Sequence, residues 1–449
     1  MFQHIPRLLK LAGPLILSSS AVTMMQLIDA FVLSHHSSEA VAAIGPSSLA
    51  VILFQGFLFG TAGYAGTFVA HNHGRADEPG VRKSAWLGIH ASLIAGLLAL
   101  LFAWPLGQLF FFTGHQAQVA TDEAHYFTIC MAGSLFPVLS SALAGWLSGI
   151  GRTVTVTWVT FISFAVNALL AWALVLGTWG CPRLGITGAA LATVLAQLLA
   201  ALLYLLIFAR SGGLTDTKAR RFDHAEFRRF LALAAPLGLR ISGELVAWTL
   251  FLIIIGRLGT VELAASSIAF RINGMAFFPA LGLGQAAGIL VGQARGAGRD
   301  ADVPAIGWQS LAVCEIWMVG MAGGFVFAAE PLVAIFAGSG ADAPHIIATG
   351  ALLMKFVALY CLVDAANIVI GCVLAAAGDT RWLARAFISA SAVFLGLLWL
   401  IDRLSPSLVT EWILATTFVG VTALVWTLRF HAGGWRAVRV LNEKAEAAD

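Results

Sequence analysis

The chain has 449 residues, of which 59% are hydrophobic and only 11% are charged, and its mean hydropathy is +0.88. Soluble domains contain about 25% charged residues, so this composition excludes a soluble protein and predicts an all-α polytopic membrane protein. The formal net charge of +3 is too small to indicate a nucleic-acid partner. The five cysteines show no paired spacing, so neither a disulfide framework nor a Cys-x-x-Cys metal site is expected.

Twelve apolar stretches are long enough to cross a membrane, which takes about 20 helical residues. The first stretch continues past any cleavage site of a signal peptide, so we interpret it as a span. Several stretches exceed about 25 residues, which predicts tilted or kinked helices. The spans are expected near residues 10–33, 41–70, 85–112, 124–148, 156–177, 184–209, 231–256, 263–293, 306–336, 346–377, 383–401 and 409–429.

The distribution of Lys and Arg between the loops predicts the orientation of the spans. Loops on one side hold 20 of these residues, six of them between Arg210 and Arg229, whereas the opposite loops hold only three. Those three residues are Arg183, Arg257 and Arg403. We therefore expect both termini to be cytoplasmic.

The second half of the sequence repeats the first. LKLAGPL at Leu9–Leu15 matches LALAAPL at Leu231–Leu237, and the same offset relates Gly66 to Gly288. LSGIGRT from Leu147 matches LAAAGDT from Leu374 at a slightly larger offset. Because six spans separate the copies, both halves enter the membrane in the same sense, as in the parallel repeats of many secondary transporters.

The repeat and the loops together predict the domain organisation. We expect two six-helix bundles related by a pseudo-two-fold axis along the membrane normal. The expected N-terminal bundle covers residues 1–209, and a cytoplasmic linker loop covers 210–230. The expected C-terminal bundle covers 231–429, followed by a cytoplasmic tail at 430–449.

The stretch from Phe356 to Ala377 contains the clearest candidate site. It is apolar almost throughout, yet Tyr360 and Asp364 are four residues apart, and Asn367 follows three residues later. On a helix this spacing puts the three side chains on one face. A carboxylate at mid-span costs about 2.5–3.5 kcal/mol, which predicts a partner or a ligand. The alternative is an aspartate that neighbouring helices satisfy, without a transport role.

Two further acids lie in predicted spans and break the repeat. Asp29 in the first span corresponds to Phe251, and Glu244 in the seventh span corresponds to Val22. Glycines and prolines that follow the repeat, beside acids that do not, indicate two halves with a common scaffold and different tasks.

Two arginines in predicted spans are candidate charge partners for these acids. Arg240 precedes Glu244 by four residues, which also fits a plain ion pair within one helix. Arg271 lies near the start of the eighth span, where it either extends to the membrane surface or pairs with an acid.

Two longer motifs carry a resemblance to a known family. The first span contains IDAFVLSHHSSEAVAA from Ile28, and the eighth contains GLG, LVGQ and GAG between Gly282 and Gly298. In these motifs the chain resembles the multidrug and toxic compound extrusion (MATE) family over essentially its whole length. The resemblance implies twelve helices in two six-helix bundles around a central cleft. It also implies cation-coupled export of organic, often cationic, amphipathic compounds.

The resemblance implies roles for residues of the N-terminal bundle. Asp29 matches the family's first-helix acid, and Pro14 matches the proline near which that helix bends in some members. Asn167 matches the fifth-helix asparagine that faces the acid. Many relatives have a second asparagine one turn later, where this chain has Ala171, and this departure weakens the prediction of sodium there.

The resemblance also implies a cation site in the C-terminal bundle. Glu244 matches the seventh-helix acid of one branch of the family, and Tyr360 and Asp364 match its tenth-helix pair. Carboxylates in a low-dielectric cavity favour their neutral form, which suits a proton carrier. With further oxygen ligands, Glu244, Tyr360 and Asp364 would instead hold sodium, the only metal ion expected. The coupling ion is therefore a proton or a sodium ion, and no other cofactor is expected.

The sequence leaves two alternatives to cation-coupled export. A lipid-linked saccharide flippase of the same superfamily needs a strongly cationic cavity, whereas the acids here outnumber the arginines within the spans. A membrane-embedded enzyme is not supported, because the sequence has no HExxH or GxSxG motif. We expect a monomer in a bacterial inner membrane whose partners are small organic cations and membrane lipids.

Overall fold

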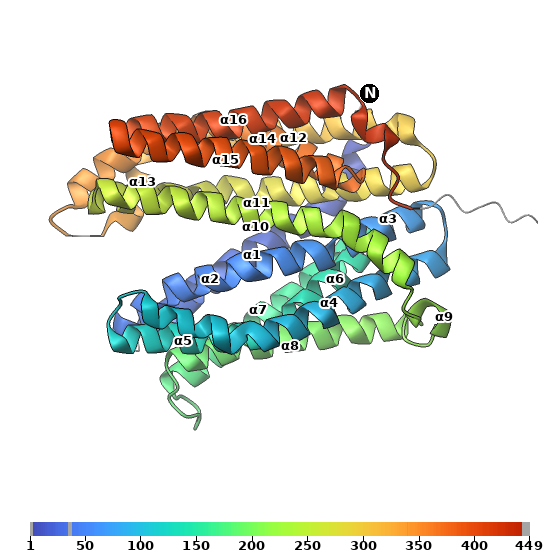
Figure 1. Cartoon of the computed structure of the whole chain (residues 1–449), viewed down its shortest axis with the longest axis horizontal. Helices are drawn as coiled ribbons and strands as arrows, with labels where there is room; N and C mark the ends of the chain where they lie inside the picture. Colours follow the sequence, from blue (N-terminus) through green and yellow to red (C-terminus); the bar gives the residue numbers. More distant parts are fainter. Residues whose placement is uncertain (1–2, 35–37, 339, 442–449) are drawn as a thin grey trace, which may run out of the picture. The chain divides into compact units, whose positions relative to one another are not determined.

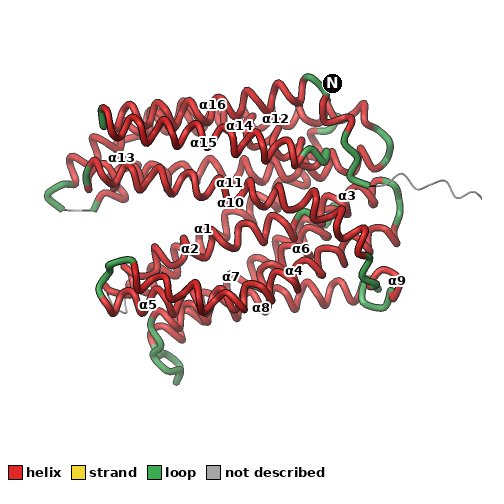
Figure 2. The backbone as a smooth tube through the Cα atoms, viewed as in Figure 1, coloured by secondary structure: helices red, strands yellow, loops and turns green. Residues whose placement is uncertain are grey.

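The computed structural model describes residues 3–34, 38–338 and 340–441, although not the side chains of residues 22–24, 26, 27, 29, 30, 34 and 38–42. The described residues form helices joined by loops, without a strand (Figure 2). The helices are α1 (Ile5–Ser34), α2 (Ser38–Gly63), α3 (Ala65–Gly74), α4 (Glu78–Gly107), α5 (Ala117–Ala132), α6 (Leu135–Gly149), α7 (Thr153–Leu176), α8 (Ile186–Arg210), α9 (Thr217–Arg220), α10 (His224–Leu258), α11 (Thr260–Gly296), α12 (Val303–Phe327), α13 (Ala329–Ala337), α14 (Ala343–Ala376), α15 (Thr380–Leu404) and α16 (Leu408–His431). Short 3-10 helices cover Gln108–Phe112, Asp300–Asp302 and Gly434–Ala437.

The predicted spans coincide with helical segments, although α4, α5 and α10 each begin seven residues before the predicted start. Ten segments of the described chain are long and apolar enough to cross a membrane, and α5 with α6 makes an eleventh if the pair is one span. The remaining predicted span lies on α1, part of which the structure does not describe in full. The fourth predicted span, 124–148, is not one straight helix, because α5 and α6 are bent by 45° about a short break.

Helix ends follow the local chemistry of the sequence. The Asp77 carboxylate accepts a hydrogen bond from the Gly80 N–H at 3.1 Å, which caps the start of α4. Gly177 ends α7 in the left-handed region, with φ of 74°, where a residue with a Cβ atom is strained. Such ends set where each predicted span starts and stops.

The chain divides into two compact units. The N-unit is Leu17–Ser242, and the C-unit is Met1–Ile16 together with Gly243–Asp449. The helix α1 therefore begins in the C-unit and ends in the N-unit, and α10 begins in the N-unit and ends in the C-unit (Figure 1). Each unit thus contains a helical piece from the opposite half of the sequence.

These exchanged pieces pack at equivalent positions of the repeat. In the N-unit, a Cβ atom on Gly60 would lie 2.8 Å from the Cα atom of Gly238 on α10. In the C-unit, a Cβ atom on Gly282 would lie 2.8 Å from the backbone nitrogen of Ile16 on α1. The offset that relates Leu9 to Leu231 also relates Gly60 to Gly282 and Ile16 to Gly238, so one backbone contact occurs twice. Glycine allows both close approaches.

The later part of the repeat shows the same equivalence inside each unit. Gly66 on α3 lies against Gly145 on α6, where a Cβ atom would meet the Gly145 carbonyl oxygen at 2.7 Å. Its counterpart Gly288 on α11 lies against Cys372 on α14, where the same contact would measure 3.4 Å. Gly145 and Cys372 are related by the larger offset, the one that relates Leu147 to Leu374. The packing therefore reproduces both offsets found in the sequence.

The predicted linker is fastened to α4 within the N-unit. The Trp86 indole donates a hydrogen bond to the Gly213 carbonyl oxygen at 3.0 Å, and Arg82 pairs with Asp216 at 3.5 Å. The Asp216 carboxylate also accepts from the backbone N–H of Ala219, and this hydrogen bond lowers the pKa of Asp216 below its ordinary value. The linker is therefore a folded part of its unit.

Candidate functional site

The candidate site in the C-unit lies on α14. Tyr360 and Asp364 are buried, with 4% and 7% of their surface exposed. The Asn367 amide donates a hydrogen bond to one oxygen of Asp364 at 3.2 Å, as their spacing on one helix face allows. The Tyr360 hydroxyl is buried and has no hydrogen-bond partner among the described residues. The face thus presents a carboxylate with one amide donor beside an unsatisfied hydroxyl.

The helix α11 lies against this stretch of α14. The Cys361 thiol lies 3.5 Å from the amide oxygen of Asn273 on α11, between the levels of Tyr360 and Asp364. A Cβ atom on Gly284 would lie 3.3 Å from the Ile368 carbonyl oxygen, so the two backbones approach closely there. Asn273 adds a polar group beside the site that the sequence analysis did not single out, although an amide within a span is a visible signal.

The remaining predicted residues of the C-terminal site differ in position. Glu244 is half-buried on α10, close enough to Asp364 for the two carboxyl groups to interact electrostatically. Arg271 is exposed on α11, with its guanidinium 5.8 Å from the centre of the Phe336 ring on α13. Arg240 belongs to the N-unit, although it precedes Glu244 by four residues on the same helix.

In the N-unit, Asn167 lies fully buried on α7 at its contact with α8. Its amide nitrogen donates a hydrogen bond to the Thr193 hydroxyl at 3.4 Å, and its amide oxygen has no partner among the described residues. One turn away, the Ser163 hydroxyl donates to the Ala196 carbonyl oxygen at 2.8 Å. Ala171, at the place of the family's second asparagine, is fully buried.

The other two predicted residues of this half lie on α1. Pro14 is inside the helix, which continues to Ser34, and it belongs to the C-unit. Asp29 is a helical residue of the N-unit, but its side chain lies outside the described residues. The predicted approach of Asn167 to Asp29 stays a prediction.

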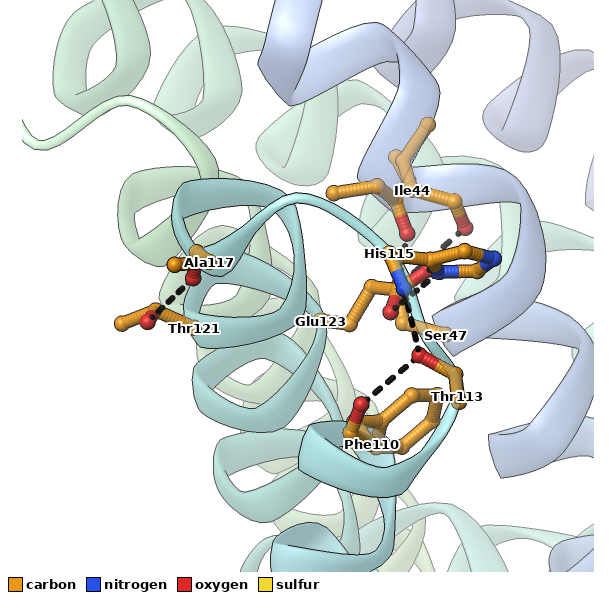
Figure 3. Close-up of polar contacts among 9 residues, drawn as sticks. Ile44, Ser47, Phe110, Thr113, His115, Ala117, Thr121 and Glu123 are labelled. Atoms are coloured by element: carbon orange, nitrogen blue, oxygen red, sulfur yellow. Dashed lines mark hydrogen bonds and ion pairs between the residues drawn. The ribbon is translucent and has the colours of Figure 1, made fainter.

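Two glutamates that the sequence analysis passed over are fully buried. Glu123 on α5 has both carboxylate oxygens 3.0 Å from the Nδ1 atom of His115, which precedes that helix (Figure 3). Glu411 lies in the first turn of α16, and neither of its oxygens has a hydrogen-bond partner among the described residues. Glu411 lies in a first turn, where sequence patterns assign acids to solvent or to the helix dipole, and Glu123 lies in the second turn of its helix.

The described residues contain no group of three or more His, Cys, Asp and Glu side chains that could hold a metal ion. Zinc and iron sites are built from such groups. The oxygen atoms of Tyr360, Asp364 and Glu244 are instead donors of the kind that bind protons or hard cations.

Comparison with known sequences identifies relatives of the whole chain. The sequence model of the family described as MatE matches residues 14–173 and 236–399. A "Probable multidrug resistance protein NorM" from Agrobacterium fabrum is 30% identical over 413 residues, which are 89% of this chain and 87% of that protein. A protein of the same name from Rhizobium meliloti is 32% identical over 272 residues, which are 58% of each chain.

Solved structures share the fold of this chain. An "Outward-facing conformation of a multidrug resistance MATE family transporter of the MOP superfamily" has a TM-score of 0.87 at 17% identity and covers 96% of both chains. A crystal structure of "MATE in complex with MaL6" has a TM-score of 0.87 at 18% identity and covers 96% of this chain and 97% of that one. A MOP superfamily transporter from Pyrococcus furiosus has a TM-score of 0.86 at 17% identity and covers 96% of both. The predicted two-lobed fold of twelve helices is thereby confirmed.

Proposed function

Because the chain belongs to the MatE family, we propose that this multidrug efflux transporter is a secondary active antiporter, which exports organic cationic amphipathic compounds in exchange for protons or sodium ions. Transport and residence in a membrane follow from the family and from the many apolar helices. We propose three further points, which are the antiport, the positive charge of the cargo, and a proton or sodium ion as the coupling ion.

One observation carries the proposal, namely the environment of Asp364. This carboxyl group is buried in a span, it receives one hydrogen bond from Asn367, and the unsatisfied Tyr360 hydroxyl lies one turn away. A purely structural aspartate would be expected to have its oxygens satisfied by neighbouring helices. A hydroxyl without a hydrogen-bond partner beside a buried carboxyl group is the arrangement expected of a site that binds and releases an ion.

Either ion suits this arrangement. A proton neutralises Asp364 directly, which removes the cost of a buried charge. A sodium ion would need several oxygen ligands, for which Asp364, Glu244 and the Tyr360 hydroxyl are the candidates. In the N-unit, Asn167 has an unsatisfied amide oxygen, and we propose that it acts with Asp29 as a second coupling position. In the same proposal, Pro14 supplies the point at which α1 bends.

The experiment is transport by purified protein in proteoliposomes, with an organic cation as cargo and one imposed ion gradient at a time. A proton gradient that drives uptake identifies proton antiport, and a sodium gradient that drives it identifies sodium antiport. Cargo movement that neither gradient changes would contradict the antiport proposal. The Asp364→Asn variant is expected to lose at least about tenfold of the gradient-driven rate.

A lipid-linked saccharide flippase is the alternative within the superfamily. Its anionic pyrophosphate would need arginines directed into a cavity, but Arg271 is exposed and lies over the Phe336 ring. Among the described residues, the spans contain the acids Glu244, Glu315 and Asp364 against the arginines Arg240 and Arg271. This balance of charge favours cationic cargo.

We also propose the placement of the protein in its membrane. Both termini and the linker are on the cytoplasmic side, and the membrane is a bacterial inner membrane. The excess of basic residues in these segments supports this orientation. The transporter is proposed to work as a monomer that contacts lipids through its apolar surface.

A further inference from the structure

The two fully buried glutamates differ in their partners. Glu123 in the N-unit is matched by His115, whose Nδ1 atom lies 3.0 Å from both carboxylate oxygens (Figure 3). Glu411 in the C-unit is equally buried, yet neither oxygen has a hydrogen-bond partner among the described residues. One buried acid therefore has a satisfied carboxylate, and the other has none of the contacts that a carboxylate needs.

Aromatic side chains surround the start of α16. Trp412, the residue after Glu411, lies against Phe270 on α11 with ring centres 5.4 Å apart, and against Phe251 on α10 at 5.7 Å. The Trp412 indole donates its hydrogen bond to the Ser266 hydroxyl at 3.1 Å, so it is not a donor to Glu411. The aromatic rings beside Glu411 offer no hydrogen bond to a buried carboxylate, which leaves only the start of α16 to favour a negative charge.

Two arginines at the neighbouring helix ends have other partners, and the nearby Asp402 has a charge of the same sign as an ionised Glu411. Arg257 on α10 pairs with Asp402 on α15 at 2.9 Å, and Arg403 lies 4.8 Å from the Trp399 ring centre. None of the ion pairs found among the described residues involves Glu411. The titratable and charged groups of the helices that meet here are Arg257 on α10, Glu262 on α11, Lys355 on α14, and Asp402 and Arg403 on α15.

We propose that Glu411 is a proton-binding site of the C-unit, where the carboxyl group carries its proton in the folded protein and loses it only when water or a cation reaches it. An unpaired carboxylate buried in an apolar setting is too costly to persist, whereas the neutral acid costs far less. A larger ligand does not fit the observations, because Trp412 and the glutamate itself are fully buried. The proton is the one cation small enough to occupy the position without a cavity.

The site lies beside the part of α14 that precedes Asp364. Trp412 meets Phe356 on α14 with ring centres 6.4 Å apart. Tyr360 follows Phe356 by one turn and Asp364 follows by two, which is about 6 Å and about 12 Å along the helix axis. If the proposed proton antiport holds, on which this step rests, Glu411 is a second protonatable group in the unit of Asp364. Its proton occupancy then contributes to the pH dependence of export.

Infrared difference spectroscopy tests proton binding without reference to transport. The purified wild-type protein is compared with E411Q, E123Q and D364N between about pH 6 and about pH 8. The carbonyl band of a neutral carboxylic acid is expected to lose one component in E411Q and to keep that component in E123Q and D364N. A spectrum of E411Q identical to that of the wild type would overturn the proposal, because Glu411 would then be ionised.

Thermal unfolding gives an independent test with a matched control. Unfolded glutamate is ionised in this pH range, so a proton held by Glu411 makes the wild type less stable as pH rises, by about tenfold in its unfolding equilibrium for each pH unit. E411Q should lose that dependence and unfold at a higher temperature than the wild type at about pH 8. E123Q should unfold at a lower temperature throughout, because it removes the negative charge and one of the two carboxylate oxygens that lie against His115. An E411Q protein that is less stable than the wild type at every pH, or that does not fold, would contradict a neutral Glu411.

Transport separates this inference from the proposed function. E411Q imitates the protonated form, so its proton-driven efflux should fall less steeply between about pH 6 and about pH 8 than that of the wild type. An unchanged pH profile of efflux would show that the proton on Glu411 has no part in the transport cycle. Transport driven by sodium alone would refute the proton antiport, and the infrared band would still decide whether Glu411 binds a proton.

Discussion

The two halves of the repeat have different residues at the position of Asp29, which indicates that this position has a different role in each half. The counterpart of Asp29 is Phe251, which is fully buried in the C-unit. Its ring meets Phe270 at 6.0 Å and Phe394 at 6.2 Å, within an aromatic cluster that fills this part of the unit. One position of the scaffold therefore carries a carboxylate in one half and core packing in the other.

We predict that Asp364→Asn abolishes drug resistance while expression stays near the level of the wild type. Asparagine keeps the shape of the side chain but removes the charge that binds a cation, and Asn367 remains able to donate to the new amide oxygen. Resistance of cells that carry the variant, together with the amount of protein in their membranes, measures the outcome. We predict the same loss for Asp29→Asn, because Asp29 is an acid within the first predicted span.

Glu330→Gln is the control for these variants, because Glu330 is an exposed acid on α13 and its charge is free to interact with solvent. Its export should equal that of the wild type. Export at the normal rate by Asp364→Asn would assign a structural role to that aspartate.

The spacing of residues on α14 was sufficient to predict the shared face of Asp364 and Asn367, because helical periodicity is local information. The burial of Glu123 and Glu411 was not predictable in this way. Each lies within a few residues of a helix end, and only the packing of other helices around those ends removes it from solvent. The partner of Glu123 is likewise a loop residue, His115, whose position depends on the turn before α5.

At the scale of the element, α1 connects a proline in one unit with an acid in the other. Pro14 belongs to the C-unit and Asp29 to the N-unit, and both lie on one helix. Proline removes a backbone hydrogen bond and favours a local bend. The helix α10 has Pro236 at the matching place but Phe251 where the acid would be, so a change of charge at this position of the repeat can act on a bend in α1 and not in α10.

We predict that Pro14→Ala and Asp29→Glu are coupled in their effect on proton-driven efflux. The expected coupling free energy is about 1 kcal/mol or more, because both changes act on the same bend. Efflux rates of the wild type, the two single variants and the double variant give this value. Pro236→Ala is the matched control and should show no coupling to Asp29→Glu. Additive effects, or unchanged transport in Pro14→Ala, would rule out the joint action.

We predict that equivalent glycines of the repeat respond differently to alanine. Gly66→Ala should lower the free energy of unfolding by about 1–3 kcal/mol, because the new methyl group would overlap the backbone of Gly145. Gly288→Ala should have little effect, since the same atom would meet Cys372 at an ordinary distance of 3.4 Å. Thermal unfolding of both variants in detergent measures the difference. Equal losses would show that the two contacts are equally tight.

Element positions were predictable because apolar length reports membrane crossing directly. The breaks within spans were not predictable in detail. The bend between α5 and α6 falls at Gly133 and Ser134, and the Gly133 position is crowded by Val194 of α8. A glycine and a serine in an apolar stretch fit an unbroken helix equally well, so the neighbouring helix decides the matter.

At the scale of the whole molecule, we predict that Lys218 faces the cytoplasm and Cys181 faces the outside. Lys218 is exposed in the linker, and Cys181 is half-buried in the loop between α7 and α8. In a protein that keeps only Cys181, an impermeant thiol reagent added to intact cells should label it. In a protein whose only cysteine is Lys218→Cys, labelling should require broken cells. The opposite pattern would invert the topology, and labelling of both from outside would refute it.

The exchange of α1 and α10 between the units has a consequence for biosynthesis. The ribosome makes residues 1–16 first, but their packing partner in the C-unit, Gly282, does not exist until the eighth span has been translated. The N-unit in turn stays incomplete until residues 231–242, beyond the linker, have entered the membrane. Neither unit is therefore a contiguous stretch that folds as it emerges, and contacts between such distant segments form late. A nascent chain halted in the linker would carry an unfinished N-unit together with an N-terminal segment that still awaits its neighbours.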